Sequence, residues 1–315
     1  MDCGLAAHLT VSLWVLAVPL WGASKMPQRA LPTSASCAKY RDVVPFELTI
    51  PDASIPVLVE IPHAGLLVPS SVQEQLSAPQ DALRRDADIF VDRLCTGVVA
   101  AGAARLTAHV SRYVVDLNRA ADDVDGAAVT GHPTPGRGQP RGVVWRSTTD
   151  GRAVLRRPLT YPELLDRLAQ FYTPYHDALR DTLHTLQARH GYAILLAAHS
   201  MPSRGRSLHN DAGVARADIV PGTQGRTTAS AVIIDAVDAH FRAAGLTVRH
   251  DDPYRGGYTT QHYGRPERDI HAVQVEISRA LYVDEQTYEP LENGAFERIA
   301  DLMTALVVRL GQIRP

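Results

Sequence analysis

The chain has 315 residues, enough for one large or two small domains. With 45% hydrophobic and 21% charged residues it has the composition of a soluble globular protein, and its net charge of −2, with dispersed basic residues, argues against nucleic acid as a partner. The three cysteines, at positions 3, 37 and 95, are too few and too scattered for a disulfide scaffold or a cysteine metal site.

Residues 1–40 are interpreted separately from the rest of the chain. Residues 9–21 are an apolar run of signal-peptide length, followed by small residues that suit a cleavage site. The run is too short to span a bilayer comfortably, so we expect no stable membrane insertion. Asp2 and the lack of basic residues before the run favour a different interpretation, in which translation starts at Met26 and the protein is cytoplasmic. Export and a start at Met26 both stay open, and a Ser-, Pro- and Ala-rich linker at 27–39 follows in either case.

The first predicted core element is a strand over residues 57–61, where a β-branched run ends at Pro62. His63 follows directly, so a histidine lies at the carboxyl end of a core strand, where open α/β sheets place their ligand crevice. Gly65 leaves the backbone room to turn and a ligand room to approach. The alternative is that His63 is a buried histidine whose hydrogen bonds are satisfied within the protein.

Residues 70–102 have a helical pattern. Val91 and Leu94 belong to its packed face, and Asp86 and Asp88 lie two positions apart, so one carboxylate is expected to point toward the crevice. The alternative is that these aspartates are charges favoured near a helix N-terminus by the macrodipole.

A second strand is predicted at residues 113–117, ending in Asn118 and Arg119. A guanidinium beside an amide at a strand end suits bidentate capture of a carboxylate. A surface ion pair of Arg119 is the alternative.

A long loop and a long helix follow. Residues 120–158 are rich in Gly, Pro, Asp and Arg, which is typical of a lid or binding loop. Residues 161–190 form an amphipathic helical pattern. We expect His176 on this helix to pack or hydrogen-bond inside the protein rather than bind a ligand.

A further core strand is predicted at residues 192–198 and ends at His199. Two core strands that each end in a histidine indicate a metal-binding crevice. Ser200 is not part of a G-x-S-x-G elbow, which argues against a serine hydrolase.

Four elements are then predicted before the last strand. They are a loop, a helix, a short strand and a second loop, at residues 202–226, 227–245, 247–250 and 252–266. The second loop is glycine-rich and presents Arg255 and Arg265.

The last strand, at residues 271–277, alternates strongly and places Glu276 in apolar surroundings. A carboxylate there must find a partner or take up a proton, as a general base in a closed site does. A buried salt bridge to Arg279 is the alternative. An amphipathic helix at residues 294–310 is expected to close the chain and dock on the sheet.

Six ordered motifs between about residues 44 and 285 resemble the N-formylglutamate amidohydrolase family. They are PHAG at 62–65, RDADIFVDRL at 85–94, SRYVVDLNR at 111–119, VWRSTTDG at 144–151, AHSMPS at 198–203 and HAVQVEISRALYVDE at 271–285. Several ordered motifs across most of a chain are more specific than any one of them. This family is in turn similar to the zinc carboxypeptidases and aspartoacylases.

The resemblance implies an α/β fold of the zinc-exopeptidase-like (phosphorylase/hydrolase-like) type. It implies a mixed central β-sheet flanked by helices on both faces, in a single catalytic domain over residues 41–315. It also implies one zinc ion per chain, although a mixed nitrogen and oxygen site accepts other divalent metals. The implied reaction hydrolyses the C–N amide bond of N-formyl-L-glutamate, or of a close N-acyl amino acid, to formate and L-glutamate.

The family's site residues can be carried over by position. His63 and His199 match its two histidine ligands, and Glu276 matches its general base. Asn118 and Arg119 match the pair that holds the substrate α-carboxylate.

Two positions depart from the pattern of the relatives. The carboxypeptidases have a glutamate ligand three residues after the first histidine, where this chain has Leu66. Asp86 or Asp88 is then expected to supply the oxygen ligand, with Asp88 preferred. Family members commonly have an aspartate shortly before the second histidine, where this chain has Ala197, a change expected to weaken metal binding by about 10- to 100-fold.

Arginines are expected to complete the site. Arg112 or Arg255 would stabilise the oxyanion, and Arg255 or Arg265 would hold the second carboxylate of the substrate. Two other functions stay open. One is an exported carboxypeptidase-like hydrolase of peptides or cell-wall fragments, and the other is a catalytically silent binding module that has kept the carboxylate clamp.

Overall fold

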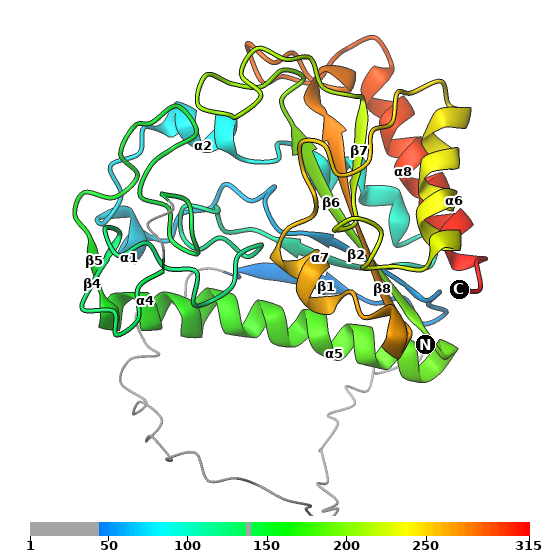
Figure 1. Cartoon of the computed structure of the whole chain (residues 1–315), viewed down its shortest axis with the longest axis horizontal. Coiled ribbons are helices and arrows are strands. Elements are labelled where there is room, and N and C mark those ends of the chain that lie inside the picture. The colour runs from blue at the N-terminus through cyan, green and yellow to red at the C-terminus, as the bar shows by residue number, and fades with distance from the viewer. Residues whose placement is uncertain (1–43, 137–139) are drawn as a thin grey trace, which may run out of the picture. The chain divides into compact units, whose positions relative to one another are not determined.

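The computed structural model describes residues 44–136 and 140–315 (Figure 1). The expectations for residues 1–40, including the signal peptide and the start at Met26, lie outside the described residues. In the part of the chain that the structure describes, no helix is both long enough and apolar enough to cross a bilayer.

A six-stranded mixed sheet forms the centre of the fold, in the order β1-β3-β2-β6-β8-β7. The inner strands run parallel, whereas the edge strands β1 and β7 are antiparallel to their neighbours. The strands span Phe46–Thr49 (β1), Val57–Ile61 (β2), Ala104–Ala108 (β3), Ala193–Met201 (β6), Ile219–Gly222 (β7) and Ile270–Ser278 (β8). A separate parallel pair joins β4 (Val129–Thr130) to β5 (Leu159–Thr160). Every residue of β2, β6 and β8 is buried, as expected for inner parallel strands that are covered on both faces.

Helices cover both faces of the sheet, as Figure 1 shows for α5 on one side and α6 with α8 on the other. Alternate residues of β2 pack on opposite faces: Val57 and Val59 join the core under α6 and α8, and Leu58 joins the core under α5. The larger helices are α4 (Tyr161–Arg167), α5 (Thr173–His190), α6 (Ala231–Ala243) and α8 (Ala295–Gly311), with a π-helical turn at Leu168–Tyr172 between α4 and α5. The predicted α/β class, with a mixed sheet between two helical layers, is confirmed.

The predicted helix over 70–102 is wrong as a continuous element. The structure has four short pieces instead: α1 (Ser70–Gln73), α2 (Gln80–Asp86), α3 (Val91–Leu94) and a 3₁₀ turn at Thr96–Val98. The helix ends after α2 because the backbone of Ala87 is extended, and Phe90 then has a left-handed φ of 63°. Asp88 therefore lies in an irregular segment rather than on a helix.

The strand predicted at 113–117 is also absent. These residues form turns: the Val114 amide bonds the Ser111 carbonyl, and the Asp116 amide bonds the Val143 carbonyl. Tyr113, Val114, Val115 and Leu117 are nevertheless buried, so their apolar run marks core packing and not a strand. The strand of this region is β3, a few residues earlier.

The segment after β6 also differs from its prediction. The predicted strand at 247–250 is reduced to one bridge, between Val248 and Ile219, and the strand lies at β7, inside the predicted loop 202–226. Helix α7 (Tyr258–Tyr263) occupies the predicted glycine-rich loop, followed by a 3₁₀ turn at Pro266–Arg268. The predicted strands at 57–61, 192–198 and 271–277, and the helices at 161–190, 227–245 and 294–310, are present with small shifts of their ends.

Glu60 is an ionisable residue inside this core. It lies in β2 and is fully buried. The Tyr175 hydroxyl donates to Glu60 Oε1 at 3.2 Å, while Oε2 has no hydrogen-bond partner among the described residues. Burial raises the pKa of Glu60 from 4.5 to about 7.

This raised pKa predicts that Glu60 makes the fold less stable as the pH rises. Between pH 4.5 and 7 the folded state keeps a proton that the unfolded chain has released, so the contribution of Glu60 to the free energy of unfolding falls by about 3 kcal/mol. The measurement is urea titration of the wild type and Glu60→Gln at about pH 4.5 and again at about pH 7.5. We expect the free energy of unfolding of the wild type, minus that of the variant, to be lower by this amount at the higher pH. A difference that is constant or increases with pH would contradict a neutral Glu60.

Candidate metal centre and active-site cavity

Three neighbouring parallel strands bring the candidate reactive groups together. His63 follows β2, His199 lies near the end of β6, and Glu276 lies near the end of β8. The register of β6 and β8 places His199 directly beside Glu276. The groups thus gather at the carboxyl ends of the strands, where open α/β sheets bind ligands.

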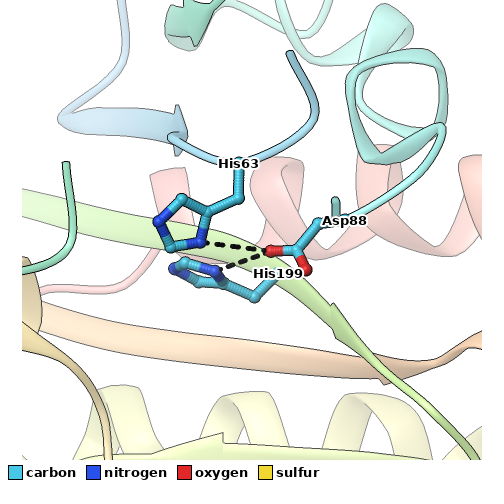
Figure 2. A group of neighbouring side chains, drawn as sticks. All are labelled: His63, Asp88 and His199. Carbon is cyan, nitrogen blue, oxygen red and sulfur yellow. Dashed lines mark hydrogen bonds and ion pairs between the residues drawn. The ribbon is translucent and has the colours of Figure 1, made fainter. Parts of the chain in front are cut away.

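His63, Asp88 and His199 form a buried cluster whose potential ligand atoms all lie within 4.8 Å of one another. Asp88 Oδ2 is 2.9 Å from His199 Nδ1 and 3.5 Å from His63 Nδ1. Figure 2 shows both imidazole rings directed at this carboxylate. The Asp88 amide also donates to the His63 carbonyl at 2.9 Å, which fixes the irregular segment against the end of β2.

This donor set fits a metal ion such as zinc. Two imidazole nitrogens and one carboxylate oxygen are the ligands found in many catalytic zinc sites. Burial raises the pKa of Asp88, but hydrogen bonds with His199 and His63 outweigh it and hold the pKa well below 3.8. The carboxylate is therefore ionised at neutral pH, as a ligand must be.

Asp116 orients His63 and was missed in the sequence. Its Oδ1 lies 2.8 Å from His63 Nε2, which leaves Nδ1 to face Asp88. Its Oδ2 accepts bonds of 2.8 Å from both Arg112 and Trp145. Such a carboxylate–histidine pair sets the tautomer and ring orientation of a ligand. The sequence feature that could have identified Asp116 is its place in the DLNR motif, two residues before Asn118.

The structure places Asp86 outside this cluster, although both aspartates were candidate ligands. Its carboxylate accepts bonds from Tyr113 (2.6 Å), from the Thr149 amide (2.9 Å) and hydroxyl, and from Arg85 (3.1 Å) and Arg206 (3.3 Å). Asp86 thereby ties two loops to the end of α2. Leu66, which stands where the carboxypeptidases have their glutamate, is exposed and also lies outside the cluster.

Glu276 is buried, and burial raises its pKa above 4.5. Its Oε1 accepts a bond of 2.8 Å from Gln274. Arg279, the alternative partner, instead donates to the carbonyls of Arg85 (2.7 Å) and Ala87 (2.6 Å) and lies 3.4 Å from Asp88 Oδ1. It therefore supports the Asp88 segment.

A cavity of about 570 Å³ is lined by His63, Asp88, His199 and Glu276. Arg112, Arg119 and Arg255 also line it. Arg119 lies 3.7 Å from Asp123, and its side chain is 38% exposed, so this ion pair is weak. Within the described residues Arg255 makes no ion pair. Arg279 lines the cavity too, together with residues that the sequence analysis gave no role, among them Thr149, Arg206, His209, Tyr254 and Gln274.

Two candidate substrate-binding residues do not have the expected placement. Arg265 does not line this cavity, and its guanidinium donates to the carbonyls of Gln261 (2.6 Å) in α7 and of Gly264 (2.8 Å) just after it. Asn118 does line it, but its amide nitrogen lies 3.3 Å from His199 Nε2 and donates to Gln274 at 3.2 Å, while its oxygen accepts from Thr259. Asn118 thus braces His199.

The comparisons with known proteins cover the residues that form this site. The family model for N-formylglutamate amidohydrolase matches residues 55–283, which include His63, Asp88, His199 and Glu276. This chain belongs to the N-formylglutamate amidohydrolase family. The resemblance of the six motifs is therefore confirmed, and the family assignment indicates a hydrolase of amides.

Curated and solved relatives cover most of the chain. The N-formylglutamate deformylase of Pseudomonas aeruginosa is 34% identical over 238 residues, which are 74% of this chain and 84% of the relative. The N-formylglutamate deformylase of Pseudomonas putida is 30% identical over 242 residues, 76% and 85% of the two chains. The crystal structure of an N-formylglutamate amidohydrolase from Ralstonia eutropha JMP134 has a TM-score of 0.77 and 32% identity, covering 86% of this chain and 98% of its own.

In this member of the N-formylglutamate amidohydrolase family, Gly257 packs directly against Asn118. A Cβ atom on Gly257 would lie 2.2 to 2.4 Å from the Asn118 amide, too close for the amide to stay in place. We expect Gly257→Ala to displace Asn118 from His199 and to lower kcat/KM for amide hydrolysis by about 10- to 100-fold, because small errors of position are costly in catalysis. Gly126→Ala, with its nearest contact at 3.1 Å from a proline side chain, is the control. Equal activity of the two variants would show that the contact is unimportant.

Proposed function

We propose that the protein hydrolyses N-formyl-L-glutamate to formate and L-glutamate and that it uses a zinc ion. The observation that carries this proposal is the His63–Asp88–His199 cluster beside the buried Glu276, in a cavity lined by arginines. The names of the two Pseudomonas relatives, both N-formylglutamate deformylases, support this substrate. A substrate with two carboxylates suits the cationic side chains around the cavity.

His63, Asp88 and His199 would hold the zinc ion. When bound, the ion supplies Lewis-acid polarisation of the formyl carbonyl and lowers the pKa of water. Other divalent metals also suit this donor set.

Glu276 would act as the general base and then as the general acid. Its raised pKa lets it accept the proton of the attacking water and later return that proton to the departing amine nitrogen. The C–N bond breaks, the water oxygen ends in formate, and the amine leaves as glutamate. Arg112, which is bonded to Asp116 and lines the cavity, would stabilise negative charge on the formyl oxygen.

The test is formate release from N-formyl-L-glutamate together with metal analysis of the purified protein. We expect about one zinc per chain and formate release that a chelator abolishes and added zinc restores. Bound zinc without formate release would contradict the proposed substrate, and formate release that survives complete metal removal would contradict the proposed cofactor.

Arg119 is proposed to hold the substrate α-carboxylate. Because its only described ion pair is long and partly exposed, the guanidinium is available to a ligand. We expect Arg119→Ala to raise KM for N-formyl-L-glutamate by about 10- to 100-fold with a smaller effect on kcat, since a charge-assisted hydrogen-bond pair is lost. Arg180→Ala, on the exposed face of α5, is the matched control. An unchanged KM would remove Arg119 from substrate binding.

A further inference from the structure

His209 lines the same cavity from the segment that joins β6 to β7. Its Nδ1 atom accepts two hydrogen bonds, from the Arg206 amide at 3.2 Å and from the Arg216 guanidinium at 2.7 Å. Both partners are donors only, so Nδ1 must present its lone pair to them. A neutral His209 therefore carries its proton on Nε2.

The surroundings keep this tautomer in place. Asp211 accepts two bonds from Arg216, from Nε at 2.7 Å and from Nη2 at 2.8 Å, and Arg216 Nη1 donates to the Tyr254 hydroxyl at 3.1 Å. Partial burial, followed by the positive charges of Arg216 and Arg206, lowers the pKa of His209 to about 4. The ring is thus neutral at physiological pH. Its orientation is fixed by Arg216, which is itself bonded to Asp211 and Tyr254.

Nε2 is the open end of this arrangement. Over residues 44–136 and 140–315, no hydrogen bond of the structure reaches His209 Nε2, although the residue lines the cavity. The guanidinium of the neighbouring Arg206 already donates hydrogen bonds to Asp86, Thr149 and the Arg85 carbonyl. The Nε2–H group is therefore free to donate to a ligand in the cavity that His209 lines, and the positive charges of the nearby arginines favour a negatively charged acceptor.

We propose that His209 is a specificity-determining residue that donates its Nε2–H to the side-chain carboxylate of an acidic N-acyl amino acid. This inference rests on the proposed function. The reacting groups, His63, His199 and Glu276, are buried, whereas His209 is only half-buried. His209 therefore meets the part of the substrate that is far from the scissile bond.

The test compares three variants on two substrates. Asparagine at position 209 offers Arg216 an acceptor near the place of Nδ1 but has no donor that reaches as far as Nε2, whereas glutamine has such a donor. We expect His209→Ala and His209→Asn each to raise KM for N-formyl-L-glutamate by about tenfold, with kcat nearly unchanged, and His209→Gln to recover part of the loss. N-formyl-L-norvaline lacks the side-chain carboxylate, so its kcat/KM should be the same in all variants.

A structural role would give a different pattern. If His209→Asn behaves as the wild type, or if each variant loses equally on both substrates, the inference is overturned.

Binding of L-glutamate to the zinc-loaded protein, measured by calorimetry, separates this inference from the proposed reaction because it needs no turnover. Weaker binding of L-glutamate, but not of L-norvaline, to His209→Asn supports the inference even if the wild type releases no formate. Equal binding of L-glutamate to the wild type and His209→Asn overturns it.

Discussion

Replacing Glu276 with glutamine is expected to lower kcat for formate release by about 10²- to 10⁴-fold, the usual contribution of a general acid–base group. Glutamine keeps the size and hydrogen-bonding capacity of the side chain but cannot accept the proton of water. The carboxylate lies beside His199 across the β6–β8 register and is bonded to Gln274, so its position is fixed by the core of the sheet. Zinc content and melting temperature should stay at wild-type values.

The control for this variant is Glu267→Gln, which changes an exposed carboxylate of the 3₁₀ turn after α7. It should retain full activity. If Glu276→Gln keeps more than about a tenth of the wild-type kcat, a different group must move the proton.

Removing either histidine of the cluster is expected to remove the metal. His63→Ala and His199→Ala each leave one nitrogen and one carboxylate oxygen, too few ligands for stable zinc binding in a site of this kind. We expect zinc to fall from about one per chain to near zero after dialysis, and formate release to fall with it. Metal analysis and the formate assay on the same preparations measure both effects.

His132→Ala is the matched histidine control, since His132 lies partly exposed in the long loop and outside the cluster. It should keep its zinc. Full zinc occupancy in both His63→Ala and His199→Ala would show that the ion binds elsewhere.

The parts of the fold that the sequence predicted well are those in which local pattern and burial agree. Residues 57–61, 193–201 and 270–278 are buried on both faces because inner parallel strands are covered on both sides, and the apolar runs at the start of the first two end near Pro62 and His199. The histidines at two of these ends could therefore be placed in one crevice before the structure was known.

The errors come from segments whose conformation depends on distant parts of the chain. Tyr113–Leu117 has the composition of a strand, but its amides bond Ser111 and Val143, so it packs in the core as turns. The break at Ala87–Phe90 sets Asp88 beside the histidines, and no local signal in an amphipathic pattern shows it. Arg265 and His209 show a different limit: their contacts, with the Gln261 carbonyl and with Arg216, are close in the sequence, but which side chain lines the cavity depends on how these irregular segments fold.

The register that joins His199 to Glu276 has a consequence for how the protein can evolve. The groups proposed for the chemistry are built into central strands, where a shift of one residue would turn Glu276 to the other face of the sheet. His209, Arg119 and Arg255 lie on connecting segments that tolerate exchange. With the substrate-binding roles proposed for these residues, substitutions in those segments would redirect the hydrolase to other amides without disturbing the strands. New substrates would then be open to gradual selection while the reaction itself is inherited unchanged.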